Sequence, residues 1–235
     1  MKGLLRALVS VPRNGRYNPS MTKPSLFLET PRLIVRRFED RDVPDILDYS
    51  KHEQDDQHRR FNIGWEFTEE SVQKWWQPMK TMTVDEATSW LALVVEVKEL
   101  GRVVGNTGFN TRKLGDQRQG AIGWTLGKAF EGNGYMTEAA AVLLEHLFSR
   151  EGFHRAYAMT STDNRKSWRL MERLGMRREA HFIKNCYHDG VWVDEYVYAI
   201  LAEEWRAKRD GAGERTNEET KGLDTRPGSS IMHGS

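Results

Sequence analysis

A glycine-bearing junction near the middle of the chain has the residue types needed to hold a phosphate group. It reads as a strand end at Gly123, a loop with Gly132-Asn133-Gly134, and a helix start at Tyr135-Met136-Thr137. Backbone N–H groups in the first turn of a helix have no partner within the helix, and glycine lets an anion approach the backbone closely. The junction therefore predicts an anion site built from main-chain amides.

Two common nucleotide-binding loops do not fit this junction. A Walker loop requires Gly-Lys-Ser/Thr after its spacer, and a dinucleotide fingerprint requires a third glycine where Thr137 stands. A pair of glycines is also frequent in ordinary turns, so a purely structural role for Gly132 and Gly134 is the alternative interpretation. The choice between them depends on the other motifs of the chain.

The elements that position this junction can be read from apolar periodicity and turn residues. Before it, we expect a strand element over residues 27–38, helices over 42–49 and from the N-cap Thr68, and strands over 90–97, 102–109 and 120–126. After it, we expect a helix over 136–148, a strand over 153–160, a helix over 164–174 capped by Asp163, and a hairpin over 178–187 and 191–201. This order predicts an α/β fold with a mixed, mostly antiparallel central sheet flanked by helices.

Composition limits the class of protein and its partners. A chain of 235 residues with 38% hydrophobic residues fits a single domain. Its formal net charge is +1, so we expect neither a nucleic acid nor a membrane as partner. The single cysteine, Cys186, excludes an intramolecular disulfide and a metal site of paired thiolates, and it favours a cytoplasmic location.

The two ends of the chain differ in composition from its centre. Residues 1–25 are interpreted as a flexible N-terminal extension, with a weak targeting peptide in the basic first twenty residues as the alternative. Residues 26–209 are expected to form the domain. Residues 210–235 are rich in Gly, Glu, Thr, Lys and Ser, so we expect a disordered tail.

Three motifs follow one another along the chain. They are Leu28-Glu29-Thr30-Pro31-Arg32-Leu33-Ile34-Val35-Arg36, then Gly123-Trp124 with Gly132-Asn133-Gly134-Tyr135-Met136-Thr137-Glu138-Ala139, and then Asn164-Arg165-Lys166-Ser167 with Leu174-Gly175-Met176. The first resembles the entry strand, the second the Q/RxxGxG/A cofactor motif and the third the NxxS…LGF element of the GNAT superfamily. Within it, the chain is similar to the branch of ribosomal-protein alanine N-acetyltransferases (RimJ/RimL-like) over roughly residues 26–205.

This resemblance implies a GNAT fold and an N-acetyltransferase that uses acetyl-CoA. The expected reaction is direct attack of a primary amine on the thioester in a ternary complex, without an acyl-enzyme. The acceptor would be a protein N-terminus or a small-molecule amine, and the protein a monomer or a homodimer without a metal. A catalytically idle domain that binds acyl-CoA as a sensor or scaffold is the alternative.

The resemblance also implies roles for individual residues. Main-chain groups of Trp124, Thr125 and Leu126 would hold the pantetheine arm. Amides from residues 131–137 would surround the pyrophosphate, and the residues predicted there are Gly132, Asn133, Gly134, Tyr135, Met136 and Thr137. Asn164 would contact the cofactor, or be only a helix-terminal residue beside the cap Asp163. Ser167 would protonate the departing thiolate, with Tyr135 or water as the alternative proton source.

The chain departs from the family pattern at positions that concern catalysis. Ala129 stands where the cofactor motif prefers Gln or Arg, Ala121 stands where relatives often carry a carboxylate, and Cys186 stands where some relatives use one. Cys186 lacks a recognisable His-Asp constellation, so an apolar filler is favoured over a nucleophile. The catalytic base is assigned first to Glu96, with Asp194, Glu195, His181 or ordered water as alternatives; for Asp194 a structural role is favoured.

Tryptophans are concentrated in the first half of the chain, where the resemblance places the acceptor side. Trp75, Trp76 and Trp90, with Trp65, are interpreted as the floor of an acceptor pocket that stacks a planar or apolar group. Burial in the core is the alternative for each of them.

Overall fold

The computed structural model describes residues 26–51, 68–188 and 190–210 of the chain. The predicted N-terminal extension, Trp65 and, apart from Asp210, the predicted tail lie outside these residues.

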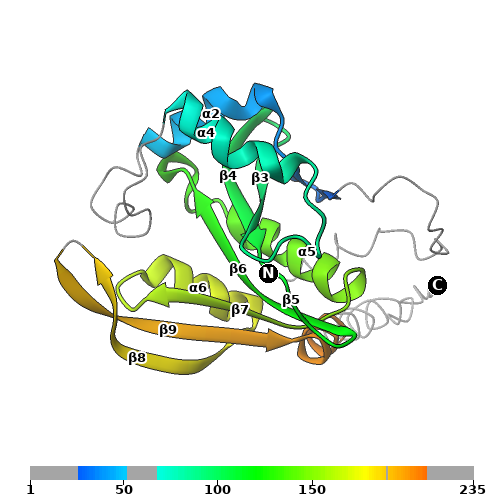
Figure 1. Ribbon diagram of the computed structural model, residues 1–235, viewed down its shortest axis with the longest axis vertical. Helices are drawn as coiled ribbons and strands as arrows, with labels where there is room; N and C mark the ends of the chain where they lie inside the picture. The colour runs from blue at the N-terminus through cyan, green and yellow to red at the C-terminus, as the bar shows by residue number, and fades with distance from the viewer. Residues whose placement is uncertain (1–25, 52–67, 189, 211–235) are drawn as a thin grey trace, which may run out of the picture.

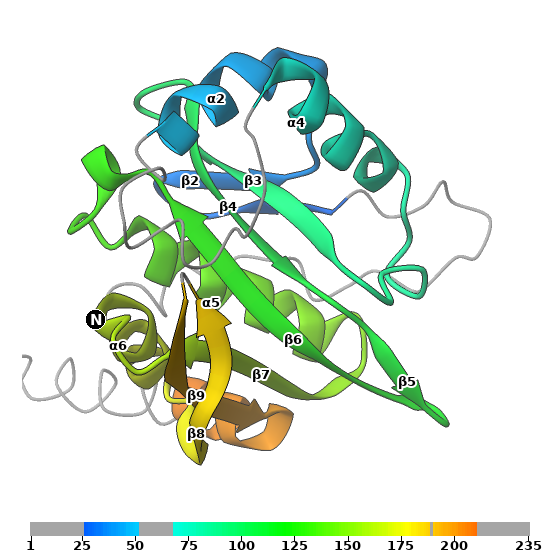
Figure 2. The same cartoon turned by 60° about the vertical axis from the view of Figure 1, so that its left-hand side comes forward.

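One twisted sheet runs through the described molecule (Figures 1 and 2). Its order is β1-β2-β3-β4-β6-β7-β9-β8, with β5 paired to β6 off this path. Every neighbouring pair is antiparallel except β6 and β7, which run parallel. The strands are β1 (Phe27–Glu29), β2 (Leu33–Arg36), β3 (Leu91–Val97), β4 (Arg102–Phe109), β5 (Arg112–Leu114), β6 (Gln117–Leu126), β7 (Phe153–Ser161), β8 (Arg177–His188) and β9 (Val191–Leu201).

Helices cover both faces of this sheet (Figures 1 and 2). The helices are α2 (Val43–Lys51), α4 (Glu69–Trp76), α5 (Tyr135–Ser149) and α6 (Arg165–Leu174), with the short 3-10 turns η2 (Asp40–Asp42), η4 (Gln77–Lys80) and η5 (Lys128–Phe130). Helices α2 and α4 lie over one face of β3 and β4, and α5 and α6 lie on the other face. The predicted α/β architecture with a mixed, mostly antiparallel sheet is confirmed.

The core lies between these layers because the central elements are apolar nearly all round. Strand β3 reads Leu-Ala-Leu-Val-Val from Leu91 to Val95, and all five side chains are buried. Such a continuous apolar run is typical of a strand covered on both faces. On α5, residues 139–144 are likewise buried, so this helix packs deeply against the sheet.

The chain after β9 forms a helix that was not predicted. Residues 202–210 are helical, and Trp205 is buried with its Nε1 donating to Glu145 of α5 at 2.8 Å. Arg209 adds an ion pair to the same carboxylate, so the segment docks on α5. The sequence signal was weak because one tryptophan supplies most of the apolar surface.

Candidate functional site

The sheet opens between its two parallel strands. Residues 118–121 of β6 pair with residues 153–157 of β7, but beyond Ala121 no pairing between them continues. Strand β6 remains paired to β4 as far as Leu126, and β7 remains paired to β9 as far as Ser161. The two strands therefore diverge toward their carboxyl ends, as Figure 1 shows.

The backbone of β6 presents unpaired groups to this opening. Thr107 donates to the carbonyl of Gly123, and the amide of Gly127 donates to Val104, so both residues direct main-chain groups toward β4. Main-chain groups alternate between the two edges of a strand. The N–H and C=O groups of Trp124 and Leu126 consequently point to the open edge.

This alternation revises one part of the sequence interpretation. Thr125 was expected to contribute main-chain groups, but its backbone lies on the β4 side, opposite Asn106. Thr125 still lines the opening, so any contact it makes there comes from its side chain.

The predicted anion loop lies beside the opening, between the end of β6 and the start of α5. Gly132 and Gly134 both have positive φ values, 81° and 77°, which favour glycine. Gly134 is the N-cap of α5 and carries no side-chain cap. The helix begins with the bond from Glu138 N to Gly134 O, so the preceding first-turn amides have no capping partner.

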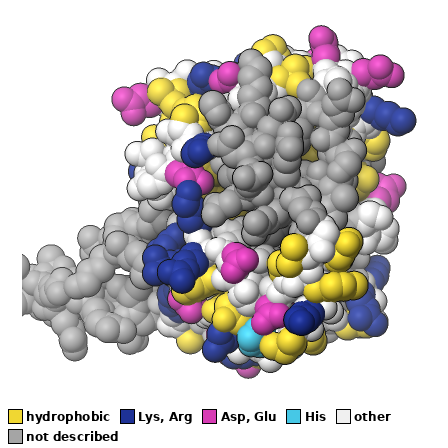
Figure 3. Space-filling model, turned by 90° about the vertical axis from the view of Figure 1, so that its left-hand side faces the viewer, with side chains coloured by type: hydrophobic (Ala, Val, Ile, Leu, Met, Phe, Trp, Pro, Cys, Tyr) yellow, Lys and Arg dark blue, Asp and Glu magenta, His cyan; other side chains and the backbone are white. Residues whose placement is uncertain are grey.

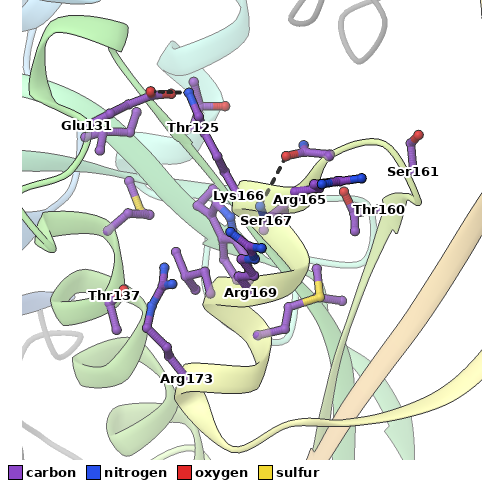
Figure 4. Close-up of a pocket in the computed structure, with 18 of the residues that line it drawn as sticks. Thr125, Glu131, Thr137, Thr160, Ser161, Arg165, Lys166, Ser167, Arg169 and Arg173 are labelled. Atoms are coloured by element: carbon purple, nitrogen blue, oxygen red, sulfur yellow. Dashed lines mark hydrogen bonds and ion pairs between the residues drawn. The ribbon is translucent and has the colours of Figure 1, made fainter. Parts of the chain in front are cut away.

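A cavity of about 1050 Å³ joins the opening to this loop. It runs along β6, the start of α5, the end of β7 and the facing side of α6, and Figure 4 shows side chains from these elements around it. Gly132, Gly134, Met136 and Thr137, four of the residues predicted to bind the cofactor, are part of its wall.

Two residues of the predicted cofactor set have side chains engaged elsewhere and do not line this cavity. The Asn133 side-chain amide donates to the carbonyls of Phe130 and Glu131. The ring of Tyr135 lies 5.0 Å from the guanidinium carbon of Arg32. Only main-chain groups of Asn133 and Tyr135 remain as candidates for anion binding.

Helix α6 forms the opposite wall, and its first residues correct a prediction. Asn164, not Asp163, is the N-cap, because its Oδ1 accepts from the amide of Ser167 at 3.1 Å. Asn164 and Ser167 both line the cavity, so the cap residue and the hydroxyl predicted to act on the thiolate share one site.

Glu96, the first choice for the base, is committed to an ion-pair network away from the cavity lining. Its Oε2 accepts from Arg36 Nη2 at 2.7 Å, and Asp42 binds the same guanidinium at 2.8 Å through both oxygens. Burial alone lowers the pKa of Arg36, but hydrogen bonds and charges of Asp42 and Glu96 outweigh burial and raise that pKa. A carboxylate held this way is a structural partner, so the geometry gives Glu96 no support as base.

The alternative bases are also paired outside the cavity lining. Asp194 accepts from the amide of Lys184 and contacts His181 Nε2 at 2.9 Å, and these contacts lower the pKa of Asp194. Glu195 accepts from the side chain of Asn185 at 2.5 Å. Among the residues that the structure describes, the carboxylates lining the cavity are Glu131 and Asp163, and Glu131 is paired with Lys166.

None of the tryptophans predicted for the acceptor pocket and described by the structure lines the cavity. Trp76 is 3% exposed and stacks on Phe38, so the prediction that it binds substrate is wrong and it belongs to the core. Trp75 packs edge-on against Trp76 and does not line the cavity. The indole of Trp90 covers two glycines: a Cβ on Gly108 would lie 2.7 Å from its Nε1, and one on Gly123 3.0 Å from its ring.

Trp90 lies on the sheet face opposite the cavity helices. Asn106 donates to the hydroxyl of Tyr49 on α2, and Gly108 shares a face with Asn106 because alternate residues of a strand do. The cavity between α5 and α6 and the indole of Trp90 therefore meet Gly123 from two sides of the sheet.

Cys186 lies on β8 opposite Val193 and is half-buried. Burial, followed by the charge of Glu195, raises the pKa of its thiol. A raised thiol pKa opposes thiolate formation, which agrees with a filler rather than a nucleophile.

Within the described ranges, no group of three or more His, Cys, Asp or Glu side chains is arranged to hold a metal ion. Nor does any helix of those ranges have the length and apolar character of a membrane span.

Comparison with known proteins gives concordant matches. The family described as Acetyltransferase (GNAT) domain matches residues 32–177. The uncharacterized N-acetyltransferase YnaD of Bacillus subtilis (strain 168) is 31% identical over 181 residues, covering 77% of this chain and 99% of its own length. The ribosomal protein uS5 alanine N-acetyltransferase of Escherichia coli (strain K12) is 23% identical and covers 79% of this chain and 96% of its own length. The crystal structure of a GNAT-family acetyltransferase from Bacillus anthracis superposes with a TM-score of 0.65 at 31% identity, covering 76% of this chain and all of its own.

Proposed function

This chain belongs to the GNAT family of acetyltransferases, and we propose that it transfers the acetyl group of acetyl-CoA to a primary amine at the opening between β6 and β7. One observation carries the proposal. The unpaired backbone edge at Trp124 and Leu126 leads directly to the uncapped start of α5 at Gly134. A strand edge followed by a helix N-terminus suits a ligand with an amide-bearing arm and a phosphate group.

The residues present fit acetyl-CoA. The N–H and C=O groups of Trp124 and Leu126 pair with the amides of the pantetheine arm as another strand would. The first-turn amides of α5 and the loop at Gly132 hold the pyrophosphate. Among the described residues, apart from its two chain neighbours, no atom lies within 4 Å of the Cβ position of Gly132. When bound, acetyl-CoA supplies the activated acetyl group as a thioester.

The protein must place the amine against the thioester, polarise the carbonyl and manage two protons. Amine nitrogen bonds to the carbonyl carbon, the carbon–sulfur bond breaks, the nitrogen loses a proton and the sulfur gains one. The open edge of β6 positions the carbonyl and offers N–H donors to its oxygen. Ser167, whose hydroxyl has no hydrogen-bond partner among the described residues, donates the proton to sulfur.

Among the described residues, the carboxylates predicted as the base are engaged elsewhere, so we assign the proton of the amine to solvent. The side chains predicted for this role are held by Arg36, His181 and Asn185. Lys166 likewise holds Glu131 on the cavity wall. The acceptor therefore reacts from its neutral fraction, and the rate rises with pH up to the pKa of the acceptor amine.

The acceptor approaches from the sheet face that carries Trp90. Met159 supports this direction, because it lines the cavity and is 47% exposed. Its neighbour Ala158 is buried opposite Tyr198, whose hydroxyl donates to Glu172 of α6, so Met159 points to the other face. Two apolar side chains thus flank the point where an amine meets the thioester.

A protein N-terminus is the acceptor class we place first, with small-molecule amines second. The relative from Escherichia coli acts on an alanine of a ribosomal protein. We propose that the enzyme works in the cytoplasm, which a single cysteine supports.

Thiol release measures this function directly. The protein is incubated with acetyl-CoA and a panel of peptides with free N-termini, those beginning with alanine first, and of small amines, and free thiol is followed with a colorimetric reagent. Thiol release that depends on a free amine is the expected result. Tight CoA binding with no turnover across the panel would instead support the idle sensor.

A further inference from the structure

Two arginines on the cavity wall, Arg169 and Arg173, have no acidic partner among the described residues. Elsewhere in the described chain, arginine side chains such as Arg36, Arg102 and Arg155 are held by carboxylates. No carboxylate of the described residues pairs with Arg169 or Arg173 of α6. The one side-chain contact seen is the packing of Arg169 over the ring of Trp168 at 5.5 Å.

Both side chains line the cavity from the same side of the helix. Residues four positions apart lie one above the other, separated by about 6 Å along the helix axis. Figure 4 shows Arg173 extending from the last turn of α6 into the space between α6 and α5, toward Thr137. Arg169 lines the same cavity one turn earlier. Together they form a pair of guanidinium groups facing the helix that begins at the anion loop.

The side chains that line the cavity carry a net positive charge. The charged residues among them are Lys128, Arg165, Lys166, Arg169 and Arg173 against Glu131 and Asp163, so five positive and two negative charges give a net +3. Within this set, Lys166 forms an ion pair with Glu131. Figure 3 shows Lys and Arg side chains gathered on the side of the molecule where α6 lies. Charge of this kind favours an anionic ligand.

The pyrophosphate does not account for these arginines. Main-chain amides at Gly132, Gly134 and the first turn of α5 already serve that group. CoA carries a further phosphate, the monoester on the 3′ position of its ribose, which has a charge approaching −2 at neutral pH. Two guanidinium forks one turn apart suit such a group, since each can donate two parallel hydrogen bonds to phosphate oxygens.

We propose that Arg169 and Arg173 bind the 3′-phosphate of the coenzyme, so that the protein distinguishes CoA from 3′-dephospho-CoA. The inference rests on the proposed function, because it takes acetyl-CoA as the ligand of the cavity. It adds a specificity determinant on α6 that the anion loop of α5 does not supply.

Calorimetric titration of the full chain tests the inference with CoA and 3′-dephospho-CoA as probes. The wild type is expected to bind CoA at least about tenfold more tightly, as lost charge-assisted hydrogen bonds would require. In the double variant Arg169→Gln/Arg173→Gln, the affinity for CoA should fall to that for 3′-dephospho-CoA, which itself should hardly change. Arg169→Lys/Arg173→Lys should keep part of the preference because the charges remain.

The control is Arg112→Gln, an exposed arginine on β5 that does not line the cavity, and its preference should equal that of the wild type. Thermal melting of each variant verifies folding. A wild type that binds both probes equally, or a folded Gln double variant that keeps the preference, overturns the inference alone. Absence of binding of either probe to the wild type overturns the proposed function as well.

Discussion

Arg32 and Glu138, 106 positions apart, are joined by two contacts to one carboxylate oxygen. Arg32 Nε lies 2.8 Å and Nη2 2.6 Å from Oε2 of Glu138, which is buried in the first turn of α5. The other carboxylate oxygen accepts from the hydroxyl of Thr30 at 2.5 Å. Arg32 Nη1 also donates to the carbonyl of Asn133 at 3.0 Å. The turn between β1 and β2 therefore braces the anion loop from behind.

Replacement of Arg32 should weaken CoA binding because the loop loses this brace. In Arg32→Ala, buried Glu138 keeps the bond from Thr30 but loses its cation, and we expect a loss of about 1–3 kcal/mol in unfolding free energy. The affinity for CoA, measured by calorimetry, should fall with it. Glu29→Ala removes the exposed ion pair with Lys98 nearby and should change neither quantity noticeably. Unchanged CoA affinity in folded Arg32→Ala would show that the loop holds its shape unaided.

Gly134 should be sensitive for two separate reasons. Its φ of 77° is costly for any residue with a Cβ, by about 1–2 kcal/mol, and it lies on the cavity wall. Gly134→Val should therefore lose stability and also weaken CoA binding. Gly115→Val provides the comparison, because Gly115 has a φ of 59° in an exposed turn away from the cavity. Equal CoA affinities for the two folded variants would argue against the placement of the pyrophosphate.

Ser167 should matter for turnover and little for binding. If its hydroxyl protonates the thiolate, Ser167→Ala should lower kcat by about 10²–10⁴-fold and leave CoA affinity nearly intact. The cap from Asn164 uses the main-chain amide of Ser167, so the substitution preserves it. Ser149→Ala, at the exposed end of α5, is the matched control. An unchanged kcat would leave water as the proton source, because the ring of Tyr135 packs against Arg32 and does not line the cavity.

Two substitutions separate the capping role of Asn164 from cofactor contact. Asn164→Ala should cost about 1 kcal/mol of unfolding free energy because α6 loses its N-cap. Asn164→Ser should keep most of that stability, since serine caps well. If the amide side chain also contacts the cofactor, the Ser variant should still show a raised KM for acetyl-CoA. A KM equal to that of the wild type would leave Asn164 with the cap alone.

Cys186 should react slowly with alkylating reagents. Its thiol pKa is raised by burial and by Glu195, so the thiolate fraction at neutral pH is smaller than for a free cysteine. Alkylation by iodoacetamide should accelerate as the pH rises and remain slower than that of a cysteine peptide at every pH below the raised pKa. Cys186→Ser should retain the wild-type kcat. A large loss of kcat would reopen a catalytic role for this thiol.

The order of elements and the anion loop could be predicted because their signals are local. Strands, helices and turns follow from apolar periods and from glycines over short windows, and the loop at Gly132 and Gly134 needs only a strand end and a helix start. Adjacent antiparallel strands follow from short connections. The opening between β6 and β7 was not visible in the pattern, because it depends on where two separate strands stop pairing.

The sequence alone determined the fold class, the family and the position of the anion loop, since each rests on residues close together in the chain. The tertiary structure decided which charged side chains pair with one another. Glu96 pairs with Arg36, Glu138 pairs with Arg32, and Trp76 is buried against Phe38. Arg169 and Arg173 line the cavity with no acidic partner in the part of the chain that the structure describes. Which carboxylate pairs with which cation depends on contacts between residues that are distant in the sequence. The interaction energy of two charges depends on the distance between them, and only the folded structure sets that distance.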